Sequence, residues 1–210
     1  MSIDLPYHQP CIENEEINEV VETLKSGWLT TGPRTLKFEE AFSNYIGCSH
    51  AIGLNSCTAG LHLALAVQGF KANDEVITTT MTFPATANAI IHAGLRPIFV
   101  DIETGTLNID VSQIEKKITP RTRAIIPVHF AGHPCDMDPI MELANKHKLT
   151  VIEDAAHAIE AKYKDRKIGN LGNPTSFSFY ANKNITTGEG GMLVLNDDSL
   201  ADKVRILRLH

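Results

Sequence analysis

One lysine stands in a loop of small residues between two segments whose composition is typical of buried strands. Lys183 follows residues 176–180 and precedes Thr187 to Gly191, after which residues 192–195 resume the apolar pattern. Removal from water lowers the pKa of a lysine, and its neutral amine can then attack an aldehyde. Most lysines are instead solvated at the surface. The pattern makes Lys183 a candidate nucleophile and leaves both interpretations open.

A carboxylate follows the apolar segment 149–152. Asp154 in this position would lie at the carboxyl end of a strand, where ligands collect in open parallel sheets. An aspartate there could bind the protonated ring nitrogen of a pyridine cofactor and keep the ring cationic, so that it withdraws electrons. The alternative is that Asp154 caps a following helix. His157 lies three residues further on.

The turn at residues 55–60 joins an expected strand to an expected helix. Its small residues would let a ligand approach the main chain, and the free N–H groups at the start of the helix would attract a phosphate. A helix cap formed by Ser56 or Thr58 explains the same residues without a ligand.

Two other site types can be compared with the sequence. A metal site would have to combine His129, His133, Cys135, Asp154 and His157, but these spacings match no familiar ligand pattern. No Gly-x-Gly-x-x-Gly sequence follows the first expected strand, which argues against a dinucleotide-binding fold.

The elements that must position these residues alternate along the chain. Hydrophobic periodicity predicts strands at 51–54, 75–79, 96–100, 123–128 and 149–152, and helices between them at 59–67, 85–92, 111–118 and 139–147. Helices are also expected at 13–25, 36–45 and 199–209, strands at 176–180 and 192–195, and a hairpin around 164–165. The alternation favours one main α/β domain with a parallel sheet covered on both faces.

Composition narrows the class of protein. The chain has 210 residues, 43% of them hydrophobic, and a net charge of −6, so we expect no basic surface for nucleic acid or membrane. The four cysteines form no Cys-x-x-Cys pair and are expected to be reduced thiols. Residues 1–6 show no signal peptide, so we expect a cytoplasmic protein. No stop signal follows the helix at 199–209, which suggests a truncated chain.

Together, these motifs resemble the DegT/DnrJ/EryC1/StrS family of nucleotide-sugar aminotransferases, which have the type I fold of pyridoxal 5'-phosphate (PLP) enzymes. The resemblance runs from residue 27 to residue 210 and is most specific at residues 176–191, with independent support from residues 153–158. Residues 128–132 are similar to the branch that aminates C4 of UDP-linked sugars, as in the 4-amino-4-deoxy-arabinose and pseudaminic-acid pathways.

The resemblance implies a three-layer α/β/α fold with a mostly parallel seven-stranded sheet. It implies that Lys183 forms the Schiff base with PLP and shuttles a proton, that Asp154 partners the ring nitrogen, and that His157 lies near the phenolic oxygen. Phe83 matches the aromatic residue that stacks on the ring. The positions that match phosphate ligands are Thr58, Ala59 and Ser178. A lysine at position 183 argues against the family's dehydratase variants, which carry histidine there.

The resemblance also implies substrates and a partner. We expect an amino group to pass from an amino acid, L-glutamate, to a nucleotide-linked 4-keto sugar, giving an amino sugar for surface polysaccharide or glycan biosynthesis. The family forms homodimers with shared active sites, and its members are considerably longer than 210 residues. We therefore expect residues 1–210 to comprise an N-terminal segment plus the PLP-binding large domain, without the small C-terminal domain. A non-catalytic PLP-binding remnant and a metal-dependent enzyme are the alternatives.

Overall fold

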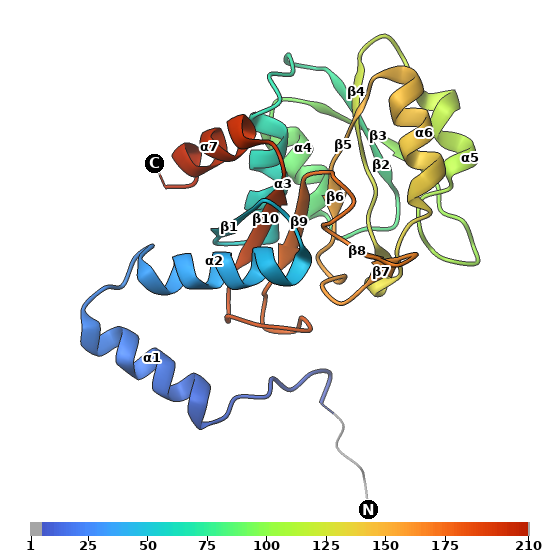
Figure 1. The fold of residues 1–210 in the computed structure, drawn as a ribbon. Helices are drawn as coiled ribbons and strands as arrows, with labels where there is room; N and C mark the ends of the chain where they lie inside the picture. Colours follow the sequence, from blue (N-terminus) through green and yellow to red (C-terminus); the bar gives the residue numbers. More distant parts are fainter. Residues whose placement is uncertain (1–5, 210) are drawn as a thin grey trace, which may run out of the picture.

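All strands of the sheet except β10 (Gly191–Leu195) have their carboxyl ends at one edge. Its strands are β1 (His50–Leu54), β2 (Glu75–Thr79), β3 (Arg96–Val100), β4 (Thr122–Ile126), β5 (Thr150–Val151), β6 (Glu153–Asp154), β9 (Thr175–Ser178) and β10 (Gly191–Leu195). A computed structural model describes residues 6–209 (Figure 1). Met1–Leu5, which hold most of the segment examined for a signal peptide, and His210, the end of the expected domain, lie outside the described residues.

Two hydrogen-bonded ladders join into a single sheet. Their orders are β1-β10-β9-β6 and β3-β2-β4-β5, and β5 and β6 are two parts of one strand that is interrupted at Ile152. The Ile152 N–H donates to the Ile125 carbonyl at 3.0 Å, and a parallel bridge pairs Val128 with Asp154. Only β10 runs antiparallel to its neighbours. The expected mostly parallel sheet of seven strands is confirmed.

Helices cover both faces of this sheet, as Figure 1 shows. These helices are α2 (Pro33–Ile46), α3 (Cys57–Ala66), α4 (Ala85–His92), α5 (Val111–Ile114), α6 (Met137–His147) and α7 (Asp198–Leu207), with 3-10 turns η1 (Glu115–Lys117) and η2 (Phe130–Gly132). One further helix, α1 (Asn14–Ser26), does not contact the sheet. A hairpin of β7 (Lys162–Tyr163) and β8 (Arg166–Lys167) follows the central strand. The expected three-layer α/β/α architecture is confirmed.

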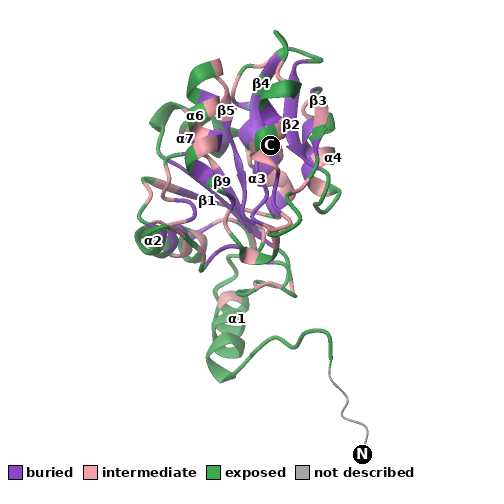
Figure 2. Cartoon of the chain, turned by 90° about the vertical axis from the view of Figure 1, so that its right-hand side faces the viewer, coloured by how far each residue is buried: buried purple, intermediate pink, exposed green. Residues whose placement is uncertain are grey.

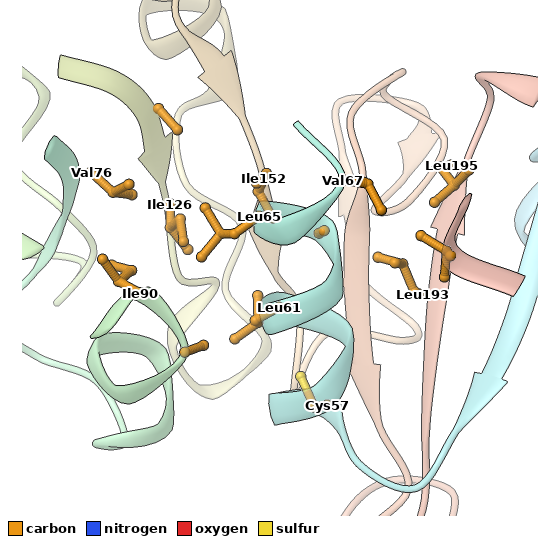
Figure 3. Packing of buried hydrophobic residues seen from close by; sticks show 14 of the residues in the cluster. Cys57, Leu61, Leu65, Val67, Val76, Ile90, Ile126, Ile152, Leu193 and Leu195 are labelled. Atoms are coloured by element: carbon orange, nitrogen blue, oxygen red, sulfur yellow. The ribbon is translucent and has the colours of Figure 1, made fainter. Parts of the chain in front are cut away.

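Alternation along each strand divides the core into two layers. Ile126, Ile152 and Leu193 pack against α3, α4 and α7, whereas their neighbours Ile125 and Val151 belong to the cluster packed against α6. Figure 3 shows Leu61 and Leu65 of α3 pointing into the first of these layers. Figure 2 shows the buried strands at the centre of the domain. Successive strand residues point to opposite faces, so apolar side chains on both faces are buried in these central strands.

The N-terminus of α3 lies directly against the start of β10. A side chain on Gly191 would overlap the main chain of Ser56, so only glycine permits this approach. A side chain on Gly60 would meet the buried Ser176 of β9 in the same way. The turn at residues 55–60 is thus fixed beside the two strands that carry the Lys183 loop.

Some predicted element bounds are wrong for identifiable reasons. The strand expected at 123–128 leaves the ladder after Ile126, because Pro127 has no N–H to donate. The helix expected at 111–118 is the short α5 continued by η1. The strand expected at 176–180 ends at Ser178, where the Lys183 loop begins.

Helix α1 stands apart from the body of the domain, as Figures 1 and 2 show. It has no buried residue, and the apolar side chains that predicted it are exposed, among them Ile17, Val20 and Leu24. Within residues 6–209, no helix has both the length and the apolar character needed to span a bilayer.

Candidate functional site

The carboxyl edge of the sheet contains a cavity of about 650 Å³. Six of the seven site residues expected from the sequence line it: Thr58, Phe83, Asp154, His157, Ser178 and Lys183. Ala59, the seventh, is next to Thr58 in the first turn of α3 but does not line the cavity. Because these residues come from the ends of different strands, the sheet brings together positions that lie far apart in the sequence.

Lys183 lies in the loop that connects β9 to β10. Its N–H donates to the Tyr180 carbonyl at 2.9 Å, and its half-buried side chain lines the cavity. Loss of hydration lowers the pKa of the amine below its ordinary value, against the opposing effects of Cys57 and the Asp154 carboxylate. A neutral amine is therefore present in a larger fraction of molecules than for a surface lysine.

Asp154 is 5% exposed and its carboxylate is held by donors on both oxygens. Oδ2 accepts a hydrogen bond from the Thr86 hydroxyl at 2.7 Å, and Oδ1 accepts from the Ala156 N–H at 3.2 Å. The Cys57 thiol is a weak third donor, 3.9 Å from Oδ1. Residues 155–161 form turns and contain no helix, so the interpretation of Asp154 as a helix N-cap is wrong.

The turn before α3 serves partly as a cap. Ser56 is the N-cap, and its hydroxyl accepts a hydrogen bond from the Ala59 N–H at 3.1 Å. The side chain of Thr58 is not the cap and lines the cavity, as does Ser178. A phosphate at this turn would meet the positive end of α3 and would compete with Ser56 for the Ala59 N–H.

Two rings lie at the rim of the cavity. Phe83 is 79% exposed although it lines the cavity, so one face of its ring is available to a planar ligand. His157 is also exposed, and its pKa is lowered chiefly by partial loss of hydration and then by the charge of Lys183, while Asp154 opposes the shift. A largely neutral imidazole at this position can accept or donate a hydrogen bond.

His129 holds the frame of the site through a buried hydrogen-bond network. Its Nδ1 accepts from the Cys135 N–H at 3.0 Å, which leaves the proton on Nε2 to donate to Glu153 Oε2 at 2.9 Å. Asn173 donates to the other Glu153 oxygen at 2.9 Å. Both ring nitrogens of His129 are therefore occupied, and in the described part of the chain no three His, Cys, Asp or Glu side chains are grouped to hold a metal.

Thr86 and Glu189 were not expected from the sequence. Thr86 is fully buried and donates to Asp154, and Glu189 lines the cavity beside Gly190. Thr82 precedes α4, so its spacing from Thr86 gave no helical signal. Glu189 lies within residues 176–191, the segment most specific for the family resemblance, but no role was expected for it.

These groups fit PLP chemically. The aldehyde requires a neutral amine, the ring nitrogen a buried acceptor, the ring a flat apolar face, and the phosphate a helix N-terminus. Lys183, Asp154, Phe83 and the first turn of α3 supply these four features around one cavity.

Comparison with known proteins identifies the family of the chain. The DegT/DnrJ/EryC1/StrS aminotransferase family matches residues 10–210. The chain belongs to this family. "Spore coat polysaccharide biosynthesis protein SpsC" of Bacillus subtilis is 55% identical over 206 residues, which are 98% of the chain and 53% of SpsC. The chain thus spans about half the length of the curated relatives it matches.

Solved structures of family members share the fold. Helicobacter pylori PseC, an aminotransferase involved in the biosynthesis of pseudoaminic acid, is 39% identical and superposes with a TM-score of 0.93, covering 98% of this chain and 56% of PseC. The sugar aminotransferase Spr1654 of Streptococcus pneumoniae, described as putative, is 37% identical with a TM-score of 0.95, over 99% of this chain and 58% of Spr1654. Spr1654 is known in PLP and PMP forms, so the family's cofactor is PLP.

The His129 network predicts a difference between two neighbouring histidines. We expect His129→Ala to lower the free energy of unfolding by about 3 kcal/mol or more, because Glu153 and the Cys135 N–H lose their buried partner. His133→Ala, on the exposed side of the same segment, should change it by less than about 0.5 kcal/mol. Urea unfolding followed by circular dichroism measures both, and equal effects would contradict the structural role of His129.

The lowered pKa of Lys183 predicts how capture of PLP depends on pH. The reactive neutral amine increases as pH rises through the lysine pKa, so capture should reach half its maximal rate below pH 10.5, the ordinary value. The growth of the visible Schiff-base absorbance after rapid mixing measures the rate at each pH. Nα-acetyl-lysine in the same buffers is the control, and a midpoint equal to that of this free amine would refute the shift.

Proposed function

We propose that this chain forms the cofactor-binding part of a PLP-dependent aminotransferase that transfers an amino group from L-glutamate to a nucleotide-linked 4-keto sugar. The observation that carries the proposal is one cavity lined by both Lys183, with its lowered pKa, and the buried carboxylate of Asp154. A surface lysine without a carboxylate partner would give no such arrangement.

The roles proposed for the residues follow from their positions. PLP, when bound, supplies an aldehyde for attachment and a ring that withdraws electrons from the reacting carbon. The Lys183 amine would attach the cofactor and, when free, would move a proton at the reacting carbon. Asp154 would accept a hydrogen bond from the protonated ring nitrogen, and Phe83 would cover one face of the ring. His157 would be the group nearest the phenolic oxygen.

The phosphate of the cofactor would be held at the first turn of α3. Thr58 and Ser178 line the cavity there, and the positive end of α3 attracts the anion. The Ala59 N–H reaches a phosphate only if it leaves the Ser56 hydroxyl, so Ser56 and the phosphate alternate as its acceptor. Binding of the phosphate would therefore replace Ser56 as the acceptor of the Ala59 N–H.

The substrates are proposed from relatives. SpsC belongs to spore coat polysaccharide biosynthesis, and PseC takes part in the biosynthesis of pseudoaminic acid, which supports a sugar acceptor and a product used in a surface glycan. The 4-keto position, the nucleotide and L-glutamate as donor rest on the resemblance of residues 128–132 and 176–191 to the family's motifs. We propose a cytoplasmic location because the four cysteines are free thiols and form no Cys-x-x-Cys pair.

A homodimer with shared active sites is proposed from the N-terminal segment. Ile17, Val20 and Leu24 form an exposed apolar face on α1, and Trp28 and Leu29 after it are 56% and 71% exposed. An amphipathic helix with an uncovered face gains burial only by binding another surface. A second copy of the chain is the partner that the family resemblance favours.

The amino transfer can be tested by absorbance with and without L-glutamate. We expect the purified chain with PLP to show a visible Schiff-base band that L-glutamate converts to the band of pyridoxamine phosphate. Lys183→Ala should lose the band, whereas Lys203→Ala, at an exposed position of α7, should keep it. A band that forms but does not respond to any amino donor would support the non-catalytic alternative.

Sedimentation velocity tests the dimer. We expect the unmodified chain to sediment as a dimer at micromolar concentration, and Val20→Glu with Leu24→Glu to sediment as a monomer because charges would enter the apolar contact. Asn18→Glu adds a charge to α1 outside the apolar face and should leave the dimer intact. Dimers that persist in the double variant would place the contact elsewhere.

A further inference from the structure

A buried chain of hydroxyl groups leads to the carboxylate of Asp154. Thr86 Oγ1 lies 2.7 Å from Asp154 Oδ2, and Thr82 Oγ1 lies 2.7 Å from Thr86 Oγ1. Thr86 is fully buried, whereas Thr82 lines the cavity. No hydrogen bond of a main-chain group supports Asp154 on this side, so Thr86 is the donor to Oδ2 among residues 6–209.

Each threonine hydroxyl has a single proton, and this fixes which group donates in each of the two hydrogen bonds. A carboxylate can only accept, so the single proton of the Thr86 hydroxyl must point toward Asp154. In the bond between the two threonines, Thr86 Oγ1 must then be the acceptor. Thr82 is therefore the first donor and Asp154 the final acceptor. Each hydrogen bond polarises the next, and the donation stabilises the negative charge of Asp154.

The main chain of Thr86 is also bonded to the turn that carries Phe83. Its N–H donates to the Phe83 carbonyl at 3.2 Å, at the beginning of α4. The Thr86 hydroxyl therefore holds the carboxylate, while the Thr86 main chain belongs to the turn that places Phe83 at the rim of the cavity. A planar cofactor bound between them would need these two groups at a constant separation.

We infer that Thr86, supported by Thr82, is a positioning residue that orients the Asp154 carboxylate toward the cavity. The inference rests on the proposed PLP function, since Asp154 and Phe83 are its proposed contacts with the cofactor ring. Thr86 acts through Asp154 and does not line the cavity itself.

The other donors at Asp154 do not replace Thr86. The Ala156 N–H and the Cys57 thiol both lie at Oδ1, and the thiol is a weak donor at 3.9 Å. Burial and the neighbouring Asp154 charge raise the pKa of Cys57 well above its ordinary value, so Cys57 stays protonated. Without the Thr86 hydroxyl, Oδ2 would lose its only protein donor among the described residues.

The test removes the hydroxyl without changing the shape of the side chain. Thr86→Val should weaken PLP binding by about tenfold or more, because a hydrogen bond to a charged group is lost. Thr86→Ser restores the donor and should recover affinity to within about threefold of the unmodified chain. Equilibrium dialysis with PLP measures the affinity, and circular dichroism of the bound cofactor reports its orientation.

The matched control is Thr78→Val. Thr78 is also fully buried, but its hydroxyl donates to the Ile126 carbonyl in the sheet at 2.9 Å and not to Asp154. We expect Thr78→Val to lower the midpoint of thermal unfolding to a similar extent while leaving PLP affinity and the visible dichroism unchanged. Equal loss of affinity in both valine variants would overturn the inference.

A variant lacking the carboxylate makes the test independent of general destabilisation. In an Asp154→Ala background, Thr86→Val should cause no further loss of PLP affinity, because the hydroxyl has lost its acceptor. Losses that add in the double variant would show that Thr86 does not act through Asp154. If the unmodified chain binds no PLP, the proposed function itself fails, whereas binding that Thr86→Val leaves intact rejects only the role of Thr86.

Discussion

The site depends on keeping the carboxylate of Asp154 out of water at the edge of the sheet. A buried charge is unfavourable unless donors and opposite charge surround it. The first strand-to-helix turn brings the Cys57 thiol, α4 brings the Thr86 hydroxyl, and the β9–β10 loop brings the Lys183 amine. The sheet brings these segments together at its carboxyl edge, where their donors and opposite charge reduce the cost of burying the carboxylate and their side chains line the cavity.

The sheet register separates two carboxylates that are adjacent in sequence. Glu153 lies in the network of His129 and Asn173, whereas Asp154 lines the cavity, because successive residues of a strand point to opposite faces. A shift of the strand by one residue would exchange the two environments. The buried His129–Glu153–Asn173 network therefore favours the register that presents Asp154 to a ligand.

The sequence allowed the layered fold and most of the site to be predicted because both depend on local patterns. The strands at 75–79 and 96–100 and the helix at 85–92 have the predicted bounds, and Lys183 and Asp154 stand out beside apolar strands. Thr86 escaped prediction because its partner lies 68 residues away and its type is ordinary for a helix. His129 suggested a metal ligand because its side-chain partners become known only once the sheet is formed.

The two ends of the Lys183 loop are tied together, since Ser178 before it and Gly191 after it are paired across antiparallel strands. Residues 179–190 therefore form an excursion, a loop that leaves the sheet at the end of β9 and returns at the paired start of β10. Phe179 anchors the start of this excursion in the core, whereas Lys183 faces the cavity and is not part of that packing. A change of the residue at position 183 would alter the chemistry available to the cavity while the strand pairing stays the same, which makes this segment a natural place for new activities to evolve.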